Sequence, residues 1–285
     1  MKDQTALVRL QRDDDGVVLI TLDNPPVNAL TRPLFTELRS VAEAFDADPP
    51  GAAVLTGLPK VFALGGEISE IYRTRFQGRR DIGDDELDAA VGEVIDPHYV
   101  RELGEKYLAT FNAFANLPCV LIAAIGGLAF GGGLELTLTC DYRIASERAK
   151  LAAPEVTLGG ASIGGGVVRL PRVVGPSMTK KLYLGGRPIS AAEALRIGLV
   201  DEVVPPEETV ERAIGLAREF ATYAGPAQTG LKRMIDSGFG LNHEEADQME
   251  LEMWCASYAT DAARMRLRAF FAHGPQPSDT PSRTA

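Results

Sequence analysis

The chain has 285 residues, of which 45% are hydrophobic and 24% are charged. This length suits one large domain or two small ones, and the composition lies far from that of chains that stay disordered. Lysine and arginine number 29 against 39 aspartate and glutamate residues, which gives a formal net charge of −10. Nucleic-acid backbones are bound by clustered positive charge, so this balance argues against a nucleic-acid-binding protein.

Cysteine content and hydropathy predict a cytoplasmic setting. The three cysteines, Cys119, Cys140 and Cys255, are odd in number and scattered, which fits neither a disulfide framework nor a zinc site. The N-terminal residues have no apolar run typical of a signal peptide, and no segment approaches the ~18 consecutive apolar residues of a membrane span. We therefore expect a soluble, cytoplasmic protein with no nucleic-acid or membrane partner.

The first half of the chain alternates predicted strands with helices. Short β-prone runs at 7–10 and 17–22 flank a charged turn and predict two successive strands or a hairpin. A helix is predicted after Thr31, because apolar residues recur at helical spacing from Leu34 to Phe45. Further apolar runs predict strands over residues 52–56, 120–125 and 142–145. Such alternation favours a parallel or mixed α/β core.

The remaining segments are predicted to be mainly helical. Residues 68–117 form a long and heavily charged stretch, and charge runs of this kind usually form a solvated face. After Gly175 the pattern is helical almost throughout, with a capping-box pattern at Ser190 and a helix end at Gly198. The Pro/Ser/Thr-rich tail, residues 274–285, is expected to be disordered.

Two glycine clusters each follow an apolar strand, at residues 62–67 and 126–135. Glycine lets the backbone turn sharply and lets N–H groups approach a ligand closely. The second cluster runs into a helical pattern from about Gly132, so its free N–H groups would favour negative charge. The spacing matches neither a phosphate-binding P-loop nor a dinucleotide fingerprint.

Two glutamates, Glu135 and Glu155, lie in apolar surroundings. Burying a charge costs several kcal/mol unless the group is paired or protonated, so both are candidates for a raised pKa and for proton transfer. They are 20 residues apart, come from different elements and could face one another across a site. A single glutamate in such a context is more often a helix cap or a salt-bridge partner, and spacing alone leaves that alternative open.

Together, these segments resemble the crotonase superfamily, the enoyl-CoA hydratase/isomerase family. The similarity extends over nearly the whole ordered chain and is carried by six ordered segments, at residues 22–30, 62–68, 126–136 with 140–145, 154–159, 169–172, and 186–194 with 198–201. The resemblance implies an α/β fold, a crotonase-like ββα spiral core at residues 1–200 with a C-terminal helical trimerisation segment at 201–273. It also implies a homotrimer or homohexamer.

The same resemblance implies an acyl-CoA substrate, with an acyl carrier protein thioester as the alternative carrier. Backbone N–H groups of Leu64 and Gly132 would form an oxyanion hole for the thioester oxygen. Glu135 would act as the base for a water molecule, and Glu155 would carry the proton to C2. The remaining residues implied to contact substrate or CoA are Asn28, Ala63, Gly65, Gly66, Glu67 and Gly131. No metal or other cofactor is implied.

The sequence also departs from the family pattern. Ser162-Ile163 stands where hydratases usually carry Pro-Gly, and Glu67 replaces the more usual Asp. The stretch at 68–117 looks longer than is typical and would cover the acyl end of the site. We expect a hydro-lyase that adds water to a 2-enoyl thioester or removes it from a 3-hydroxyacyl thioester. Enoyl-CoA isomerisation, C–C bond cleavage or hydrolysis is the alternative, and a binding-only role is a third hypothesis.

Overall fold

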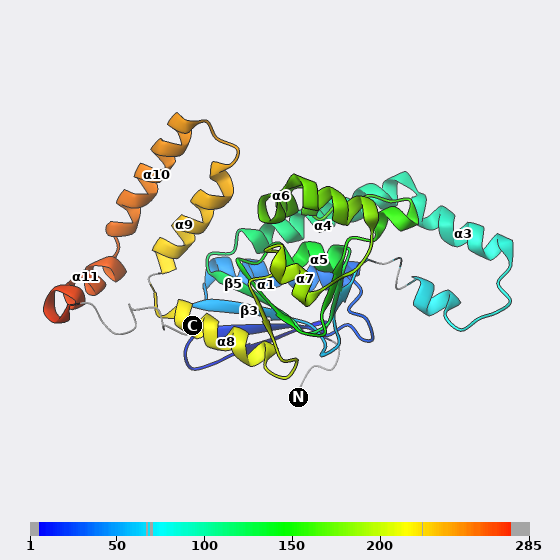
Figure 1. The fold of residues 1–285 in the computed structure, drawn as a ribbon, viewed down its shortest axis with the longest axis horizontal. Helices are drawn as coiled ribbons and strands as arrows, with labels where there is room; N and C mark the ends of the chain where they lie inside the picture. Colours follow the sequence, from blue (N-terminus) through cyan, green and yellow to red (C-terminus); the bar gives the residue numbers. More distant parts are fainter. Residues whose placement is uncertain (1–5, 67, 69–70, 224, 275–285) are drawn as a thin grey trace. The chain divides into compact units, whose positions relative to one another are not determined.

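The computed structural model describes residues 6–66, 68, 71–223 and 225–274. The chain divides into two compact units, one ending at Ala221 and the other beginning at Thr222. The first unit contains both β-sheets and the helices that pack on them, and the second is made of helices (Figure 1). The mixed α/β architecture and the C-terminal helices confirm the predicted fold class.

The larger sheet of the first unit has six strands, in which β1 and β2 pair antiparallel and all other neighbours pair parallel. In spatial order they are β1 (Val8–Arg12), β2 (Val17–Leu22), β3 (Ala52–Thr56), β5 (Val120–Ile125), β7 (Tyr142–Ser146) and β10 (Glu202–Val204). The predicted hairpin and the three predicted strands are confirmed. β10 was not predicted, because three residues carry too little periodic signal.

Helices cover both faces of this sheet. On one face, α1 (Arg32–Ala47) buries Leu34, Leu38 and Phe45 in the main core, as its sequence spacing predicts. On the other face, α8 (Thr209–Ala221) buries Ala213 and Ala217 against the strand residues whose side chains point away from α1 (Figure 1). This packing places α8 in the first unit, which ends at Ala221.

The smaller sheet has four strands, β4 (Val61–Leu64), β6 (Leu128–Phe130), β8 (Lys150–Ala152) and β9 (Ile189–Ser190). The first three run parallel, and β9 pairs antiparallel with β8. Leu64 pairs with Phe130, which in turn pairs with Ala152, so the three parallel strands end side by side. Segments that follow these strands therefore emerge at the same edge of the sheet.

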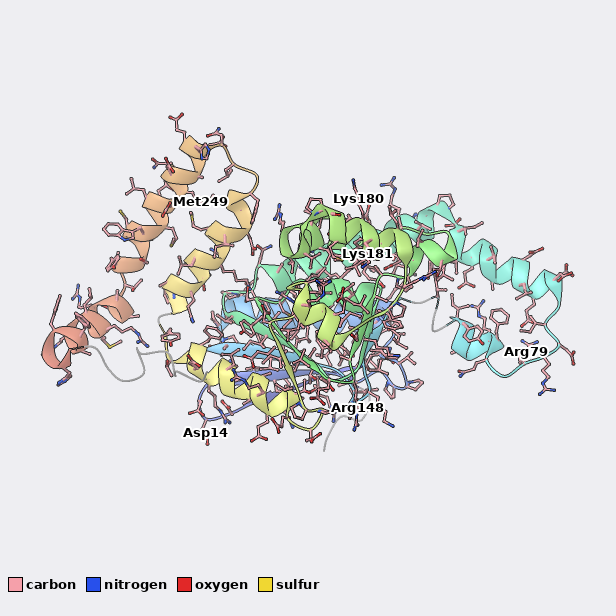
Figure 2. All side chains as sticks on the ribbon, in the orientation of Figure 1. Asp14, Arg79, Arg148, Lys180, Lys181 and Met249 are labelled. Atoms are coloured by element: carbon pink, nitrogen blue, oxygen red, sulfur yellow. The ribbon has the colours of Figure 1, made fainter. Side chains whose placement is uncertain are left out.

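The other helical segments of the first unit are η1 (Tyr72–Phe76), α3 (Asp84–Ile95), α4 (Pro97–Ala115), α5 (Gly132–Thr137), η2 (Glu155–Leu158), α6 (Gly166–Gly185) and α7 (Ala191–Arg196). The region 68–117 is mainly helical as predicted, and its charges lie in exposed ion pairs such as Arg75 with Glu93. Charged side chains lie on the outside, where Arg79 and the α6 residues Lys180 and Lys181 point to solvent (Figure 2).

The second unit contains α9 (Gly225–Gly238), α10 (His243–Tyr258) and α11 (Asp261–His273). Asn242 and Glu245 form a capping box at the start of α10, and Thr260 caps α11. Large apolar side chains stay exposed in this unit, among them Ile235, Trp254 and Phe271. The predicted disordered tail lies, apart from Gly274, outside the described residues. In the described part of the chain, no helix has the length and apolar character needed to cross a membrane.

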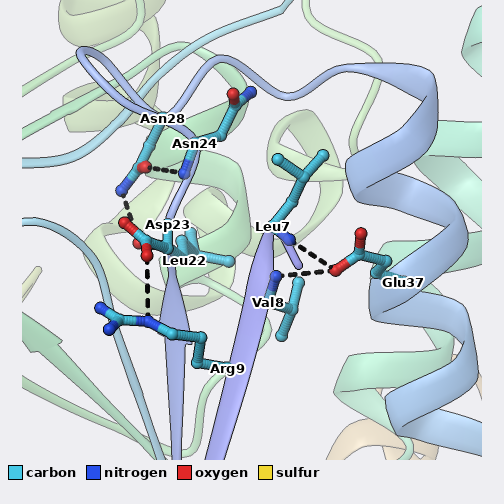
Figure 3. A network of polar contacts seen from close by, with 8 residues as sticks. All are labelled: Leu7, Val8, Arg9, Leu22, Asp23, Asn24, Asn28 and Glu37. Carbon is cyan, nitrogen blue, oxygen red and sulfur yellow. Dashed lines mark hydrogen bonds and ion pairs between the residues drawn. The ribbon is translucent and has the colours of Figure 1, made fainter. Parts of the chain in front are cut away.

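Asn28 ties the end of β2 to β4, and Figure 3 shows its contacts with Asn24 and Leu22. This buried residue has a positive φ of 49°, its Oδ1 accepts from the Asn24 N–H at 2.8 Å, and its Nδ2 donates to the carbonyls of Leu22 (3.1 Å) and Phe62 (2.9 Å). The side chain is thus used within the fold, and the expected contact of Asn28 with substrate or CoA stays a prediction. Next to it, Arg9 of β1 pairs with Asp23, the residue after β2, at 3.0 Å.

Replacing Asn28 with alanine is expected to lower the free energy of unfolding by about 2–4 kcal/mol, because buried carbonyls lose donors and alanine disfavours a positive φ. Chemical denaturation measures this. Asn116→Ala is the matched control, since Asn116 is an exposed asparagine on α4's C-terminal end with one side-chain bond to its own helix, and it should cost less than about 0.5 kcal/mol. Equal costs for the two variants would contradict this role of Asn28.

Candidate active site

The two glycine clusters and Glu155 meet at the edge where β4, β6 and β8 end. A side-chain carbon added to Gly131 would lie 3.0 Å from Oε1 of Glu155 and 3.7 Å from Cα of Gly65. Gly65 follows β4, Gly131 follows β6, and Glu155 comes three residues after β8. The parallel pairing of the strands thus brings together residues that are far apart in the sequence.

Backbone geometry around Gly131 fixes the start of α5. Gly131 has a φ of 57°, and its N–H donates to the carbonyl of Ala152 at 2.8 Å. A side-chain carbon on Gly133 would lie 2.1 Å from the buried Ala63 carbonyl oxygen, so only glycine lets α5 approach β4 this closely. The Gly132 N–H is the first of α5, and among the described residues it has no hydrogen-bond acceptor.

The Leu64 amide is engaged within the fold. Its N–H donates to the carbonyl oxygen of Val27 at 3.1 Å. The sequence-based expectation was an open donor, so the two expected oxyanion-hole amides differ: Gly132 offers an unused N–H, while Leu64 would have to share its hydrogen. The next residue, Gly65, has a φ of 67°, and its carbonyl accepts from Leu30. Glu67 lies outside the described residues.

Glu135 lies on α5 and is 2% exposed. One carboxylate oxygen accepts from the Gly164 N–H at 3.0 Å and the other from the Gly166 N–H at 2.9 Å. Gly166 is the first residue of α6, so Glu135 satisfies amides at the start of that helix. The glycines are needed here, because a side-chain carbon on Gly166 would lie 2.6 Å from Glu135 Oε1.

Two opposing effects set the pKa of Glu135. Burial, the largest, raises it, and the negative charge of Glu155 raises it further. The hydrogen bonds from Gly166 and Gly164 and the positive charge of Arg169 lower it. Burial prevails, and the pKa of Glu135 rises from 4.5 to about 7. The raised pKa predicted from the apolar sequence context is therefore found for Glu135, and this carboxyl can exchange protons near neutral pH.

Glu155 is half-buried and begins η2. Its Oε2 is inaccessible to solvent and has no hydrogen-bond partner among the described residues. Its Oε1 lies beside Gly131. Because its charge acts on Glu135, the two carboxylates belong to one electrostatic site, as their sequence context suggested.

Aromatic residues of α4 cover the other side of the site. The Tyr107 ring lies against Gly132, and a side-chain carbon there would be 2.7 Å from the ring. One turn later, Phe111 lies against Gly164 and next to Glu135, where a carbon on Gly164 would be 2.6 Å from the ring. The two rings pack edge to face at 5.4 Å. The Tyr107 hydroxyl also reaches Gly66, where an added carbon would lie 2.6 Å from it.

Sequence reasoning did not assign Tyr107, Phe111, Arg169 or Tyr183 to the site. Arg169 donates to the Gly164 carbonyl at 3.0 Å and holds the turn before α6. The i, i+4 aromatic spacing of Tyr107 and Phe111 was a usable signal for a shared helix face. Tyr183 lies in α6 without any motif around it, and only the folded chain brings it close to Glu135.

A model of the enoyl-CoA hydratase/isomerase family matches residues 12–100 and 83–277, two stretches that overlap over α3 and the start of α4. The chain belongs to this family, within the crotonase superfamily. A relative from Rhizobium meliloti described as a probable enoyl-CoA hydratase is 38% identical over 95% of this chain and 96% of its own length. The mitochondrial enoyl-CoA hydratase of Pongo abelii is 32% identical over 90% of this chain and 81% of its own.

Solved structures of the family share the fold. The crystal structure of an enoyl-CoA hydratase from Bacillus anthracis superposes with a TM-score of 0.82 at 30% identity, covering 96% of this chain and 100% of that one. A structure of Pseudomonas aeruginosa DspI gives the same TM-score and identity over 96% of this chain and 97% of its own. The predicted family and fold are therefore confirmed over nearly the full length.

The pKa of Glu135 predicts how stability depends on pH. The folded chain binds this proton more tightly than the unfolded chain, with a pKa of about 7 against 4.5. The stability that this proton adds to the folded state is therefore complete below pH 4.5, and it is lost as the pH rises to about 7. Between pH 5 and 7.5 the free energy of unfolding should fall by about 2–3 kcal/mol more for the wild type than for Glu135→Gln, which has no such proton. Urea denaturation across this pH range measures the difference, and parallel pH curves for the two proteins would contradict it.

Proposed function

We propose that this protein catalyses the reversible addition of water to a 2-enoyl-CoA thioester. The observation that carries the proposal is the convergence of two interacting glutamates, Glu135 and Glu155, on the edge where Gly132 offers an unused amide. Hydration of such a thioester needs a base for water, an acid for C2 and a donor for the thioester oxygen. Membership in the family and the hydratase names of similar proteins support the same reaction.

Glu135 suits the role of the water's base. With a pKa of about 7, it is ionised in a substantial fraction of molecules at neutral pH and is basic enough to accept a proton. Glu155 then delivers a proton to C2 as the hydroxyl bonds to C3, and the reverse direction returns both protons. One carboxyl accepts a proton as the other gives one, so the pair holds the same number of protons before and after the addition.

The thioester oxygen gains negative charge as the hydroxyl adds, and backbone amides are its proposed stabilisers. The Gly132 N–H is the principal donor because it has no competing acceptor among the described residues. The Leu64 N–H would be the second, sharing its hydrogen with Val27. One well-placed donor of this type contributes about 3–4 kcal/mol to transition-state stabilisation. The reaction is redox-neutral proton chemistry, so we expect it to need no cofactor beyond the CoA carried by the substrate.

We also propose that copies of the chain associate through the second unit. The apolar side chains exposed on α9, α10 and α11, such as Leu231, Trp254 and Phe270, would be costly to leave in water. Association as a trimer or a dimer of trimers would cover them. Light scattering coupled to size-exclusion chromatography measures the assembly, and a monomer at micromolar concentration would contradict this proposal.

Glu135→Gln and Glu155→Gln are each expected to lower kcat for enoyl-CoA hydration by at least about 100-fold, because each removes one proton-transfer group. Glu147→Gln, at an exposed glutamate in the first unit, is the matched control and should keep wild-type turnover. Straight-chain, aromatic and cyclic enoyl-CoA esters are assayed by mass spectrometry for the gain of one water, and circular dichroism checks the fold.

Water enriched in ¹⁸O separates hydration from isomerisation. Hydration places solvent oxygen in the product, whereas moving a double bond within the acyl chain does not. Full hydration activity in both glutamine variants would exclude the proposed roles. Conversion of a 3-enoyl-CoA ester without incorporation of the label, and with no hydration of any 2-enoyl ester, would identify an isomerase instead.

A further inference from the structure

Tyr183 of α6 lies against Glu135, and a glycine makes room for it. A side-chain carbon on Gly166 would lie 2.2 Å from the Tyr183 hydroxyl oxygen, 2.6 Å from Oε1 of Glu135 and 2.7 Å from its Cγ. The phenol oxygen and the carboxylate therefore occupy the same small space beside the Gly166 backbone. Any larger residue at position 166 would displace one or both groups.

The Tyr183 hydroxyl is buried without a hydrogen-bond partner among the described residues. The neighbouring Ser162 hydroxyl and Oε2 of Glu155 are likewise buried and unpartnered. A buried polar group without a partner costs about 1–3 kcal/mol, and phenylalanine would avoid that cost at the same volume. The Ser162 hydroxyl is near enough to act on the pKa of the Tyr183 hydroxyl, but the two groups do not have the geometry of a formed hydrogen bond. The place of the hydroxyl beside Glu135 offers a chemical reason for a tyrosine at this position.

The groups facing Glu135 come from three directions. The Gly164 and Gly166 amides and Tyr183 face it from the start and middle of α6, together with the positive charge of Arg169. The charge of Glu155 acts on it from η2. From α4, the apolar ring of Phe111 lies alongside. Apart from the two amides, Tyr183 is therefore the neutral donor next to this carboxylate.

We propose that Tyr183 is a positioning residue for Glu135, because its hydroxyl donates to the carboxylate when Glu135 is ionised and holds the base in place. The inference rests on the proposed function, in which Glu135 is the base for water. A small shift of the phenol ring, together with rotation about its C–O bond, brings the hydrogen onto Oε1, and the hydrogen turns toward Ser162 when Glu135 holds its own proton.

Burial and the charges of Glu135 and Glu155 raise the pKa of the Tyr183 hydroxyl, while Ser162 lowers it. The raised pKa keeps the phenol protonated, so it remains a donor throughout the working pH range. A donor to the ionised form lowers the pKa of a carboxyl. Tyr183 thus opposes part of the upward shift that burial imposes on Glu135, and it keeps more of the base ionised at neutral pH.

The test is Tyr183→Phe, which removes only the hydroxyl. Its kcat at pH 7 should fall about 10-fold with KM changed less than about 2-fold, and the acidic limb of the pH profile of kcat/KM should move up by about one pH unit. Its melting temperature should stay close to that of the wild type, because the cost of burying the hydroxyl offsets the hydrogen bond that it gives to the ionised carboxylate. Wild-type kinetics and an unmoved pH profile would overturn the inference, as would a melting temperature several degrees lower, which would reveal a structural role.

A double-mutant cycle tests whether Tyr183 acts through Glu135. In the Glu135→Gln background, adding Tyr183→Phe should lower the residual kcat by less than about 2-fold. A further loss as large as in the wild-type background would overturn the inference. Tyr142→Phe is the matched control, since Tyr142 is a partly buried tyrosine on β7 whose hydroxyl contacts Glu202 at 3.4 Å, and its pH profile should stay unchanged.

Failure of the proposed function shows in the wild type before any variant is compared. A wild-type protein that hydrates no 2-enoyl-CoA ester overturns both the function and the inference. A wild type that hydrates, with Tyr183→Phe variants that are indistinguishable from it, overturns the inference alone.

Discussion

The buried carboxylate of Glu135 is the interaction on which the site depends. It accepts hydrogen bonds from Gly164 and Gly166 and so joins α5, on which it lies, to the start of α6. The same burial that makes these bonds strong also raises the pKa of the carboxyl to about 7. One side chain thus fixes the packing of two helices and carries a carboxyl that can exchange protons near neutral pH.

The sheet edge explains how the site assembles around that carboxylate. Three parallel strands end in register, and the segments that follow β4, β6 and β8 supply Gly65, Gly131 and Glu155. Glycine is required around the site at Gly133, Gly164 and Gly166 for a common reason: an added carbon would strike a backbone carbonyl, an aromatic ring or a carboxylate. The close approach of α4 and α6 to α5 is therefore possible because glycine has no side-chain carbon.

Strong local patterns were predictable from the sequence. The strand at 52–56 was predicted over the residues that form it, and the apolar context of Glu135 signalled its burial and raised pKa. Long-range contacts were not predictable. The bond from Leu64 to Val27, the internal use of Asn28 and the approach of Tyr183 to Glu135 each join segments without a shared motif. The boundary after Ala221 depends on which helix packs on the sheet. The sequence of an amphipathic helix shows that one face is buried, but not which element that face packs against.

The segment between the two acids is anchored at both ends. Glu155 starts η2 next to Gly131, and the backbone returns to Glu135 at Gly164. Residues 156–163 are mostly solvent-exposed, so this arc can change in sequence or length while its two attachment points stay where they are. Evolution, or a protein engineer, can therefore vary this exposed rim independently of the two carboxylates beneath it.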